Sequence, residues 1–341
     1  MNYLYLILSL FFTQILFAEI TKEQCFNIDH TNNISIRERD QDGHNVCWGF
    51  LTAALIEEEN CLHSPSLCGQ SLSVFDSMRN DWPLGKKNEL RDVEYAITFG
   101  LANGICLESD APFAEGSGLY CQAKELLENR GVKCLTSKLE NIFQEYKPKL
   151  NTEDCESNLA LPIRDMIDYL NTIANISDLV ILQEGESTSA LIIAEDKSEF
   201  LKNILIPNRC QNNRIISPAR NGRQVTTEMF VNPSPFHETS ISFKLEKIKS
   251  ILTNGRSLGL GICSKNLKQF INEDVSVHSK IPLDKKKCGN HGILAQGMRW
   301  NTFNNRCEIK IINSWGEDTE INGWISAEKV ISSSYMQIYI Q

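Results

Sequence analysis

Three residue types that can together break an amide bond are spread along this 341-residue chain as Cys47, His291 and Asn313. A cysteine thiolate is a strong nucleophile, an imidazole can move the proton, and an amide can orient that imidazole. Taken singly, each residue has an ordinary explanation, because a lone cysteine is more often a buried core residue or half of a disulfide. The sequence around each residue therefore has to decide between a catalytic role and an ordinary structural one.

The residues around Cys47 predict the start of a helix. Apolar side chains recur at helical spacing from Trp48 to Leu55, directly after the cysteine. A helix dipole favours an anion at its N-terminus, so this position is predicted to lower the pKa of the thiol. A nearby imidazolium would lower that pKa further. The position thus meets the first requirement of a nucleophilic cysteine.

Residues 41–50, with the sequence QDGHNVCWGF, resemble the active-site segment of the papain-like cysteine peptidases. That family places a glutamine six residues before the nucleophile. The resemblance implies that the side-chain amide of Gln41 and the backbone N–H of Cys47 form an oxyanion hole, with Trp48 supporting the site. A neutral amide donor suits an oxyanion that forms only in the transition state.

Two segments near the C-terminus resemble the same family. Residues 290–294 (NHGIL) resemble its histidine strand, and residues 310–316 (KIINSWG) resemble its NSWG motif. The resemblance implies that His291 is the base, that Asn313 accepts a hydrogen bond from one imidazole nitrogen, and that Trp315 shields this contact from water. The order cysteine, histidine, asparagine is also the order found in the family.

The resemblance implies an α+β fold of the papain type, with a helical N-terminal lobe, a β-barrel-like C-terminal lobe and an inserted subdomain. It implies an exported cysteine peptidase that hydrolyses peptide bonds through a thiolate nucleophile and an acyl-enzyme. The expected partner is a peptide or protein substrate, the protein is expected to be a monomer, and no cofactor is expected. The resemblance covers roughly residues 28–122 and 243–341.

The chain departs from the family's pattern in several places. His44 stands where the family usually has a disulfide cysteine, and is a polar rim residue, a modulator of the thiolate, or neither. The family's paired glycines, which hold substrate backbone, are replaced around Leu90 and Arg91. The stretch between the cysteine and histidine motifs is about 100 residues longer than in the family. This surplus lies within residues 121–240, and either limits access to the cleft or is a surface subdomain.

The chain divides into four predicted regions. Residues 1–18 carry no charge and end in a small residue, which predicts a signal peptide and a secreted or periplasmic protein; the alternatives are a membrane anchor or a buried helix. Residues 19–120 form the N-terminal part with the cysteine helix, 121–240 the insertion, and 241–341 the β-rich lobe. The stretch before the cysteine motif is too short for an inhibitory propeptide of the usual kind.

Periodicity predicts the elements that position these motifs. Helices are expected at 72–80 and 90–103, with Gly104 ending the second, and a short helix at 247–252. Alternating apolar residues predict strands near 258–262, 293–295 and 309–311. The 12 cysteines predict disulfides in an exported chain, and at least one cysteine besides the nucleophile should be unpaired.

Composition argues against several other classes of protein. A net charge of −9 without a basic stripe argues against nucleic-acid binding. The sequence contains no CxxC pair, and its histidines do not have the spacing of metal ligands, so no metal site is expected. No segment after residue 18 is apolar for long enough to span a bilayer, so stable membrane insertion is not expected. Two rivals stay open: a catalytically inactive binding or inhibitor protein with the papain-like fold, and another Cys–His amidase or acyltransferase.

Overall fold

The structure is a computed structural model. It describes residues 20–30, 39, 46–79, 91–111, 113, 143–144, 147, 193–196, 199–200, 202–203, 206, 208–230, 241–272, 290–314 and 322–341. The predicted signal peptide, most of the predicted insertion, and the residues Gln41, His44, Leu90 and Trp315 lie outside these residues. Within them, no helix is both long enough and apolar enough to cross a membrane.

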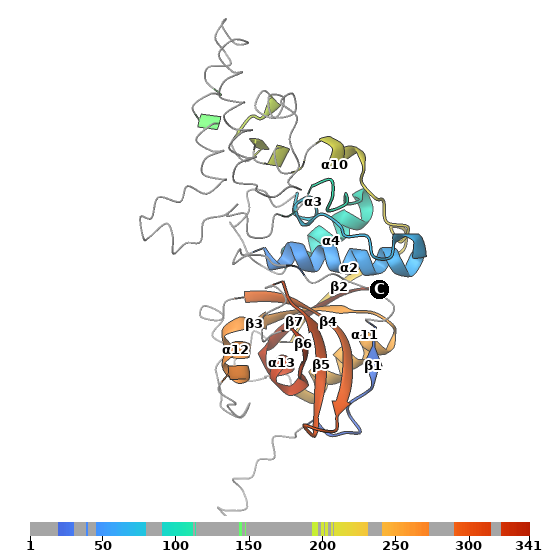
Figure 1. The fold of residues 1–341 in the computed structure, drawn as a ribbon, viewed down its shortest axis with the longest axis vertical. Helices are drawn as coiled ribbons and strands as arrows, with labels where there is room; N and C mark the ends of the chain where they lie inside the picture. Colours follow the sequence, from blue (N-terminus) through green and yellow to red (C-terminus); the bar gives the residue numbers. More distant parts are fainter. Residues whose placement is uncertain are drawn as a thin grey trace, which may run out of the picture.

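The described residues form a mixed fold of helices and one antiparallel sheet, which confirms the predicted α+β class (Figure 1). The elements in chain order are β1 (Ile28–Asp29), α2 (Cys47–His63), η1 (Pro65–Leu67), α3 (Val74–Ser77), α4 (Arg91–Asn103), α10 (Asn208–Asn212), β2 (Val225–Met229), α11 (Ile241–Thr253), β3 (Leu258–Cys263), α12 (Ser264–Asn272), β4 (Asn290–Asn301), β5 (Arg306–Ile312), β6 (Gly323–Ser326), α13 (Ala327–Ser333) and β7 (Ser334–Ile340).

The sheet has the strand order β2-β7-β3-β4-β5-β6, and β1 pairs with the long strand β4. Helices cover both of its faces. One buried apolar cluster joins α2 and α4 to side chains of β4 and β7, and a second joins α11 and α13 to side chains of β3, β4 and β5. In Figure 1, α2, α3, α4 and α10 accordingly lie together on one side of the strands. The sheet is therefore the shared layer between two cores.

Helix α2 approaches the sheet closely because two strand positions facing it are glycines. A Cβ atom added at Gly259 on β3 would lie 2.7 Å from the Leu51 side chain, and one at Gly292 on β4 would lie 3.3 Å from it. Contacts this short force a neighbour to move. The glycine that follows His291 thus lets the first turns of α2 lie directly against the histidine strand.

Several predicted elements match the structure in position. A helix does begin at Cys47, and strands occupy 258–263, 290–301 and 306–312. Gly104 follows α4 with a φ of +73°, the left-handed conformation that glycine adopts at little cost. The predicted helix at 72–80 is shorter in the structure, at Val74–Ser77, where the Ser73 side chain accepts a hydrogen bond from the Asp76 N–H.

Two boundaries differ from the sequence prediction. The short helix predicted at 247–252 is α11, which spans Ile241–Thr253 because its apolar face continues upstream to contact the sheet. Residues 225–229 fall within the predicted 121–240 insertion, yet they form β2 and pair along their whole length with β7. Part of the predicted insertion is thus a strand of the sheet.

Disulfides connect distant parts of the described chain. Cys25 is bonded to Cys307, Cys61 to Cys68, and Cys106 to Cys210, and Cys263 is also disulfide-bonded. Such bonds persist in oxidising compartments, so they agree with an extracellular character. The one free thiol among the described cysteines is that of Cys47.

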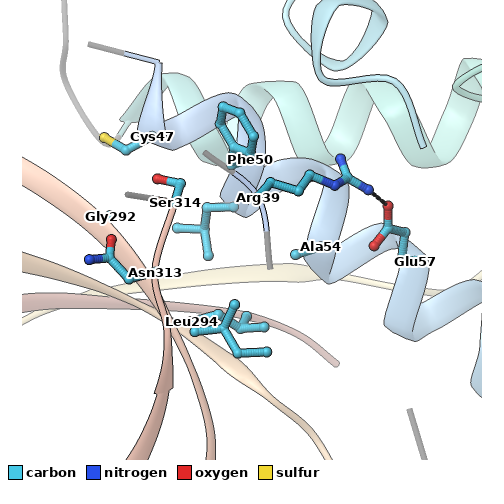
Figure 2. Close-up of a pocket in the computed structure, with 11 residues that line it drawn as sticks. Arg39, Cys47, Phe50, Ala54, Glu57, Gly292, Leu294, Asn313 and Ser314 are labelled. Atoms are coloured by element: carbon cyan, nitrogen blue, oxygen red, sulfur yellow. Dashed lines mark hydrogen bonds and ion pairs between the residues drawn. The ribbon is translucent and has the colours of Figure 1, made fainter. Parts of the chain in front are cut away.

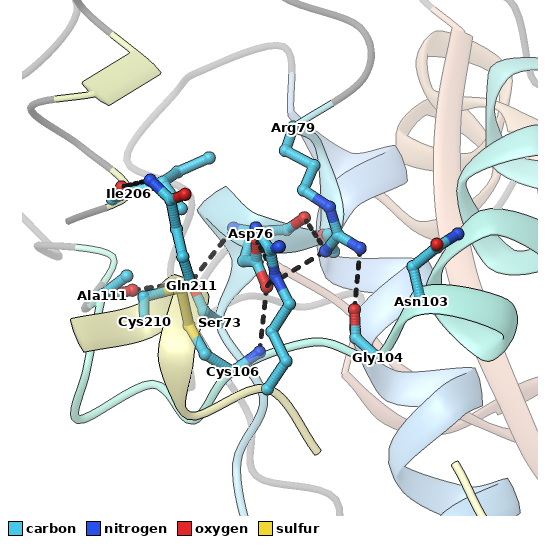
Figure 3. A network of polar contacts seen from close by, with 12 residues as sticks. Ser73, Asp76, Arg79, Asn103, Gly104, Cys106, Ala111, Ile206, Cys210 and Gln211 are labelled. Atoms are coloured by element: carbon cyan, nitrogen blue, oxygen red, sulfur yellow. Dashed lines mark hydrogen bonds and ion pairs between the residues drawn. A yellow bond between two sulfur atoms is a disulfide. The ribbon is translucent and has the colours of Figure 1, made fainter. Parts of the chain in front are cut away.

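A buried polar network joins the chain before the predicted insertion to the last part of that insertion (Figure 3). The Asp76 side chain is fully buried and forms ion pairs of 3.0 Å with Arg79 and 2.9 Å with Arg214, and it accepts a hydrogen bond from the Cys106 N–H. The Cys106–Cys210 disulfide lies beside it, with its two Cα atoms 5.1 Å apart. The chain before residue 114 and the chain after residue 207 are therefore fixed to each other.

Candidate active site

The Cys47 thiol lies at a helix terminus that is open to an anion. Cys47 is the first residue of α2, and the residue before it, Val46, has no side chain that caps the helix. The first turn contains no acidic residue. The backbone N–H groups of Gly292, Trp48 and Cys47 itself interact with the sulfur. The thiol therefore faces both the first turn of the helix and the residue that follows His291.

Burial decides the protonation of this thiol in the resting structure. It raises the pKa of Cys47 above its ordinary value, and the three backbone N–H groups act in the opposite direction with a smaller effect. The sequence predicted a lowered pKa, because helical position is visible in a sequence and burial against β4 is not. This prediction was wrong in direction: the isolated thiol is held in its neutral form.

His291 and Asn313 meet in the interior of the protein. The His291 Nε2 and Asn313 Oδ1 atoms are 2.7 Å apart, and both residues are almost fully buried. An amide oxygen can only accept a hydrogen bond, so Nε2 carries the proton. The other ring nitrogen, Nδ1, is then the basic nitrogen of the neutral imidazole. The contact fixes both the tautomer and the direction of the ring.

Burial also keeps the imidazole uncharged. It lowers the pKa of His291 to about 4, and the positive charge of Lys268 lowers it as well, whereas the hydrogen bond to Asn313 acts to raise it. At neutral pH the ring is therefore a free base. A neutral thiol and an unprotonated imidazole are the forms from which a proton transfer from sulfur to the ring would start.

Asn313 is itself held in place from the following turn. Its backbone N–H donates to Asn322 Oδ1 over 2.7 Å. Its side-chain Nδ2 is buried and has no hydrogen-bond partner among the residues that the structure describes. The amide oxygen thus binds the histidine, and the backbone hydrogen bond to Asn322 fixes the position of Asn313 just after β5.

A pocket of about 380 Å³, including its open side, joins the thiol to the interior between α2 and the sheet (Figure 2). Cys47, Asn313 and Ser314 lie at one end, and the ion pair of Arg39 and Glu57 lies at the other. Its lining residues are Arg39, Cys47, Phe50, Leu51, Ala54, Glu57, Gly292, Leu294, Ile312, Asn313 and Ser314. The predicted nucleophile and the predicted orienting amide therefore border the same space.

Among the other predicted site residues, Trp48 is buried at the second position of α2, and its backbone N–H is one of those acting on the sulfur. Gln41 and Trp315 lie outside the described residues, so their roles stay predictions. Four further residues near the site escaped the sequence reasoning: Arg39, Glu57, Ser314 and Tyr335. Burial raises the pKa of the Tyr335 phenol, and its interaction with Cys47 raises it further.

One group of side chains among the described residues is close enough to hold a metal ion, namely Asp76, Cys106 and Cys210. The two cysteines form a disulfide, and the carboxylate is occupied by two arginines, so the group offers no thiolate ligand. It is a structural network.

Comparison with known proteins gives only distant likenesses. No family model matches the chain, and no curated protein matches it. Among solved structures, SERA5E from Plasmodium falciparum has a TM-score of 0.42 and 9% identity, covering 91% of this chain and 92% of that chain. PepW from Lactobacillus rhamnosis HN001 has a TM-score of 0.44 and 11% identity, covering 92% of this chain and 81% of that chain. At these scores the likeness carries no argument, so function is argued from this chain's own residues.

Proposed function

We propose that this protein is a cysteine peptidase of the papain-like type, in which Cys47 attacks the scissile carbonyl, His291 moves the proton and Asn313 orients His291. The observation that carries the proposal is the buried 2.7 Å contact between His291 Nε2 and Asn313 Oδ1, on the strand whose next residue, Gly292, contacts the free thiol. An arrangement in which an amide fixes the tautomer of a base beside a helix-terminal thiol suits nucleophilic catalysis.

The pKa directions favour one form of this chemistry. Because burial holds both the thiol and the imidazole neutral, the sulfur loses its proton to His291 Nδ1 as it attacks, and not beforehand. The new S–C bond forms while the carbonyl π electrons move onto oxygen. The backbone N–H of Cys47 and the amide of Gln41 hold that oxyanion.

The second half of the reaction returns the site to its starting state. His291 gives its proton to the leaving amine as the C–N bond breaks, which leaves an acyl group on the sulfur. The neutral imidazole then takes a proton from water, and the resulting hydroxide attacks the thioester. The S–C bond then breaks, the thiolate recovers its proton from His291, and the products are an amine and a carboxylic acid that ionises in water. Asn313 holds the ring for both transfers by accepting from Nε2.

The remaining proposals follow from this one. The helical part around α2 and the sheet part around β4 would be the two lobes of a papain-like fold, with the reactive groups contributed from both. The disulfides support export to an oxidising compartment, where the substrate would be a peptide or protein.

The decisive experiment compares the wild-type protein with Cys47→Ala. A fluorogenic peptide library should be hydrolysed by the wild type, and the variant should lose activity by at least about 10⁴-fold, as expected when a nucleophile is removed. Its urea midpoint should be unchanged. Retained hydrolysis in Cys47→Ala would refute the assignment.

A second arm separates the two rivals. Wild-type protein that is alkylated at Cys47 by iodoacetamide but hydrolyses no peptide would be the inactive binding or inhibitor protein. Release of ammonia from free amides or peptidoglycan fragments, or transfer to an added amine, without peptide hydrolysis would identify the amidase or acyltransferase. The matched control is Cys61→Ser with Cys68→Ser, which removes the disulfide near the C-terminal end of α2 and should leave the labelling of Cys47 intact.

A further inference from the structure

The C-terminal end of α2 carries a cluster of charged side chains that lies outside the pocket lined by Cys47. At its centre is Glu59, which is almost fully buried and binds two arginines from other parts of the chain. The Arg223 Nε atom lies 2.7 Å from Glu59 Oε1, and Arg256 binds Oε2. His63, one turn further along the helix, places its Nδ1 atom 3.3 Å from Oε1. One carboxylate therefore joins the end of α2 to two other segments.

The two arginines reach Glu59 from turns with the same local sequence. Each follows an Asn-Gly pair shortly before a strand, in residues 221–223 before β2 and in residues 254–256 before β3. The glycines of the two turns, Gly222 and Gly255, both have positive φ angles, of +87° and +75°. The protein thus contains two matched turns that present an arginine to the same carboxylate, and any difference between them has to come from other contacts.

The difference between the turns is a contact of Arg223 with His63. The His63 Nδ1 atom lies 3.0 Å from the backbone oxygen of Glu59, and Nδ1 carries the proton because a carbonyl oxygen can only accept. The Arg223 Nη2 atom meets the other ring nitrogen, Nε2, and a guanidinium can only donate. This contact therefore requires the neutral ring, with its lone pair on Nε2. Within the described part of the chain, no hydrogen bond joins Arg256 to the ring.

A proton on Nε2 of His63 opposes the contact with Arg223 directly. The ring then presents an N–H to another N–H donor, and its positive charge lies against that of the guanidinium. The charged groups that meet the ring, directly or through Glu59, are Arg223 and Arg256, so three cations would surround this carboxylate. Histidine is the side chain whose charge ordinarily changes between pH 5 and 8. The contact is therefore one that acidification can break.

We propose that His63 is a pH-sensitive switch: the neutral ring holds the turn of Arg223 against the end of α2, and the protonated ring releases that turn together with the start of β2. The inference goes beyond the proposed peptidase function and does not depend on it. Arg223 is the more exposed of the two arginines, with 27% of its side-chain surface accessible against 18% for Arg256, so water can hydrate it once it is released.

The strand that follows Arg223 is placed to respond. Gln224, the next residue, donates a 3.3 Å hydrogen bond to the backbone oxygen of Gln341 and accepts a 2.8 Å one from its N–H. Strand β2 is at the end of the described sheet, where it pairs with β7 alone. The ends of such an edge strand open at low cost in free energy, so the loss of a neighbouring charged contact should be seen there first.

Amide hydrogen exchange at pH 7.5 and pH 5, corrected for the pH dependence of the intrinsic exchange rate, measures this release. Exchange at Gln224 should be about tenfold or more faster at pH 5, as expected when a hydrogen bond to a charged group is lost. Residues 254–258, in the matched turn of Arg256, should change by less than about twofold. Burial raises the pKa of Glu58 to about 7, and Glu58 binds Ser257 in that turn, so every protein compared should carry Glu58→Gln.

Two substitutions of the histidine should fix the switch in its two states. His63→Gln can donate and accept without taking up a proton, so exchange at Gln224 should stay slow at both pH values. His63→Lys is charged at both, so exchange should already be fast at pH 7.5.

The comparison of His63 with His63→Gln decides the proposal, whether or not His63→Lys folds. The switch is overturned if Gln224 exchanges equally fast at pH 7.5 and pH 5 with His63 in place, or if His63→Gln shows the same acceleration. It is also overturned if residues 254–258 open to the same extent as Gln224, because the whole end of α2 would then loosen without a specific role for the Arg223 contact.

Discussion

The polar network around Asp76 and the candidate site around His291 are both buried, but they treat charge in opposite ways. Two guanidinium groups and a backbone N–H surround the Asp76 carboxylate, so its charge is matched inside the protein. At the other site, burial acts against charge on both Cys47 and His291, and Lys268 disfavours an imidazolium further. One region keeps permanent charges that hold the chain together, and the other keeps Cys47 and His291 neutral.

The comparison predicts that the largest losses of stability come from the Asp76 region. Replacing Cys106 and Cys210 by serine opens a loop of 104 residues and should lower the free energy of unfolding by about 5 kcal/mol. Replacing Cys61 and Cys68 opens a separation of only 7 residues and should cost about 2 kcal/mol. Urea denaturation of both double variants measures the difference. Equal losses would show that loop closure does not govern these bonds.

The carboxylate of Asp76 should have the next largest effect. Asp76→Ala leaves the buried guanidinium of Arg79 and the partly buried one of Arg214 without their shared partner, and it should lower the free energy of unfolding by roughly 3–5 kcal/mol. Alkylation of Cys47 in the folded fraction should proceed at the wild-type rate, because no contact of Asp76 reaches the thiol. The control is Glu246→Gln, which removes an exposed pair with Lys249 and should cost less than about 1 kcal/mol. A slowed thiol in Asp76→Ala would mean that the two regions are coupled.

The pH dependence of stability should expose the neutral histidine. The pKa of His291 in the folded protein, about 4, lies below its ordinary value of 6.5, so the unfolded chain takes up a proton first as the pH falls. The stability contributed by neutral His291 is present above pH 6.5 and is lost as the pH falls toward 4, by about 3 kcal/mol. His291→Gln cannot take up this proton. Its free energy of unfolding relative to that of the wild type, measured in urea titrations, should therefore rise as the pH falls from 6.5 to 4.

Glu58 changes the pH dependence of stability in the opposite direction, so its effect has to be removed from the comparison of wild type with His291→Gln. Burial raises its pKa to about 7 although it accepts hydrogen bonds from the N–H and hydroxyl of Ser257. Its contribution is present below pH 4.5 and is lost as the pH rises toward 7. The measurement is therefore best made in a Glu58→Gln background, with and without His291→Gln. Parallel pH curves for the two proteins would contradict a buried neutral histidine.

The same contrast explains what the sequence could predict. Local patterns are enough to place a helix start at Cys47, a stop at Gly104 and strands at the histidine and asparagine motifs, because each depends on neighbours in the chain. The contact of His291 with Asn313 was also expected, from two motifs with a known chain order. What needed the structure is long-range: the burial that raises the thiol pKa, and the contacts of Arg39 with Glu57 and Glu108.

The place of residues 225–229 also depends on long-range contacts. Residues 225–229 look unremarkable in the sequence, and only their pairing with β7 shows that they belong to the sheet. Cys106 and Cys210 could not be paired from sequence either, since many connectivities are possible for 12 cysteines. A deletion that tests the insertion must therefore stop before residue 208. Removing residues up to 235 would delete an edge strand and test the fold instead.

The smallest predicted effect distinguishes orientation from charge at the site itself. Asn313→Ala removes the acceptor that fixes the His291 tautomer, and kcat should fall about 10- to 100-fold, as for other residues that orient a functional histidine. Asn313→Asp keeps the acceptor and adds a negative charge, which should raise the pKa of His291 and retain more activity than Asn313→Ala. The acid limb of its activity profile should move to higher pH, because the ring then keeps its proton up to a higher pH. The control is Asn322→Ala, which removes the acceptor of the Asn313 backbone N–H and should affect the rate through position alone, without moving that limb.

If Asn313→Asp and Asn313→Ala have the same pH profile, the amide does not control the charge of the ring. Burial alone would then set the charge of His291. The difference from the Asp76 region would lie in how the two sites are packed, and not in a polar partner of the histidine.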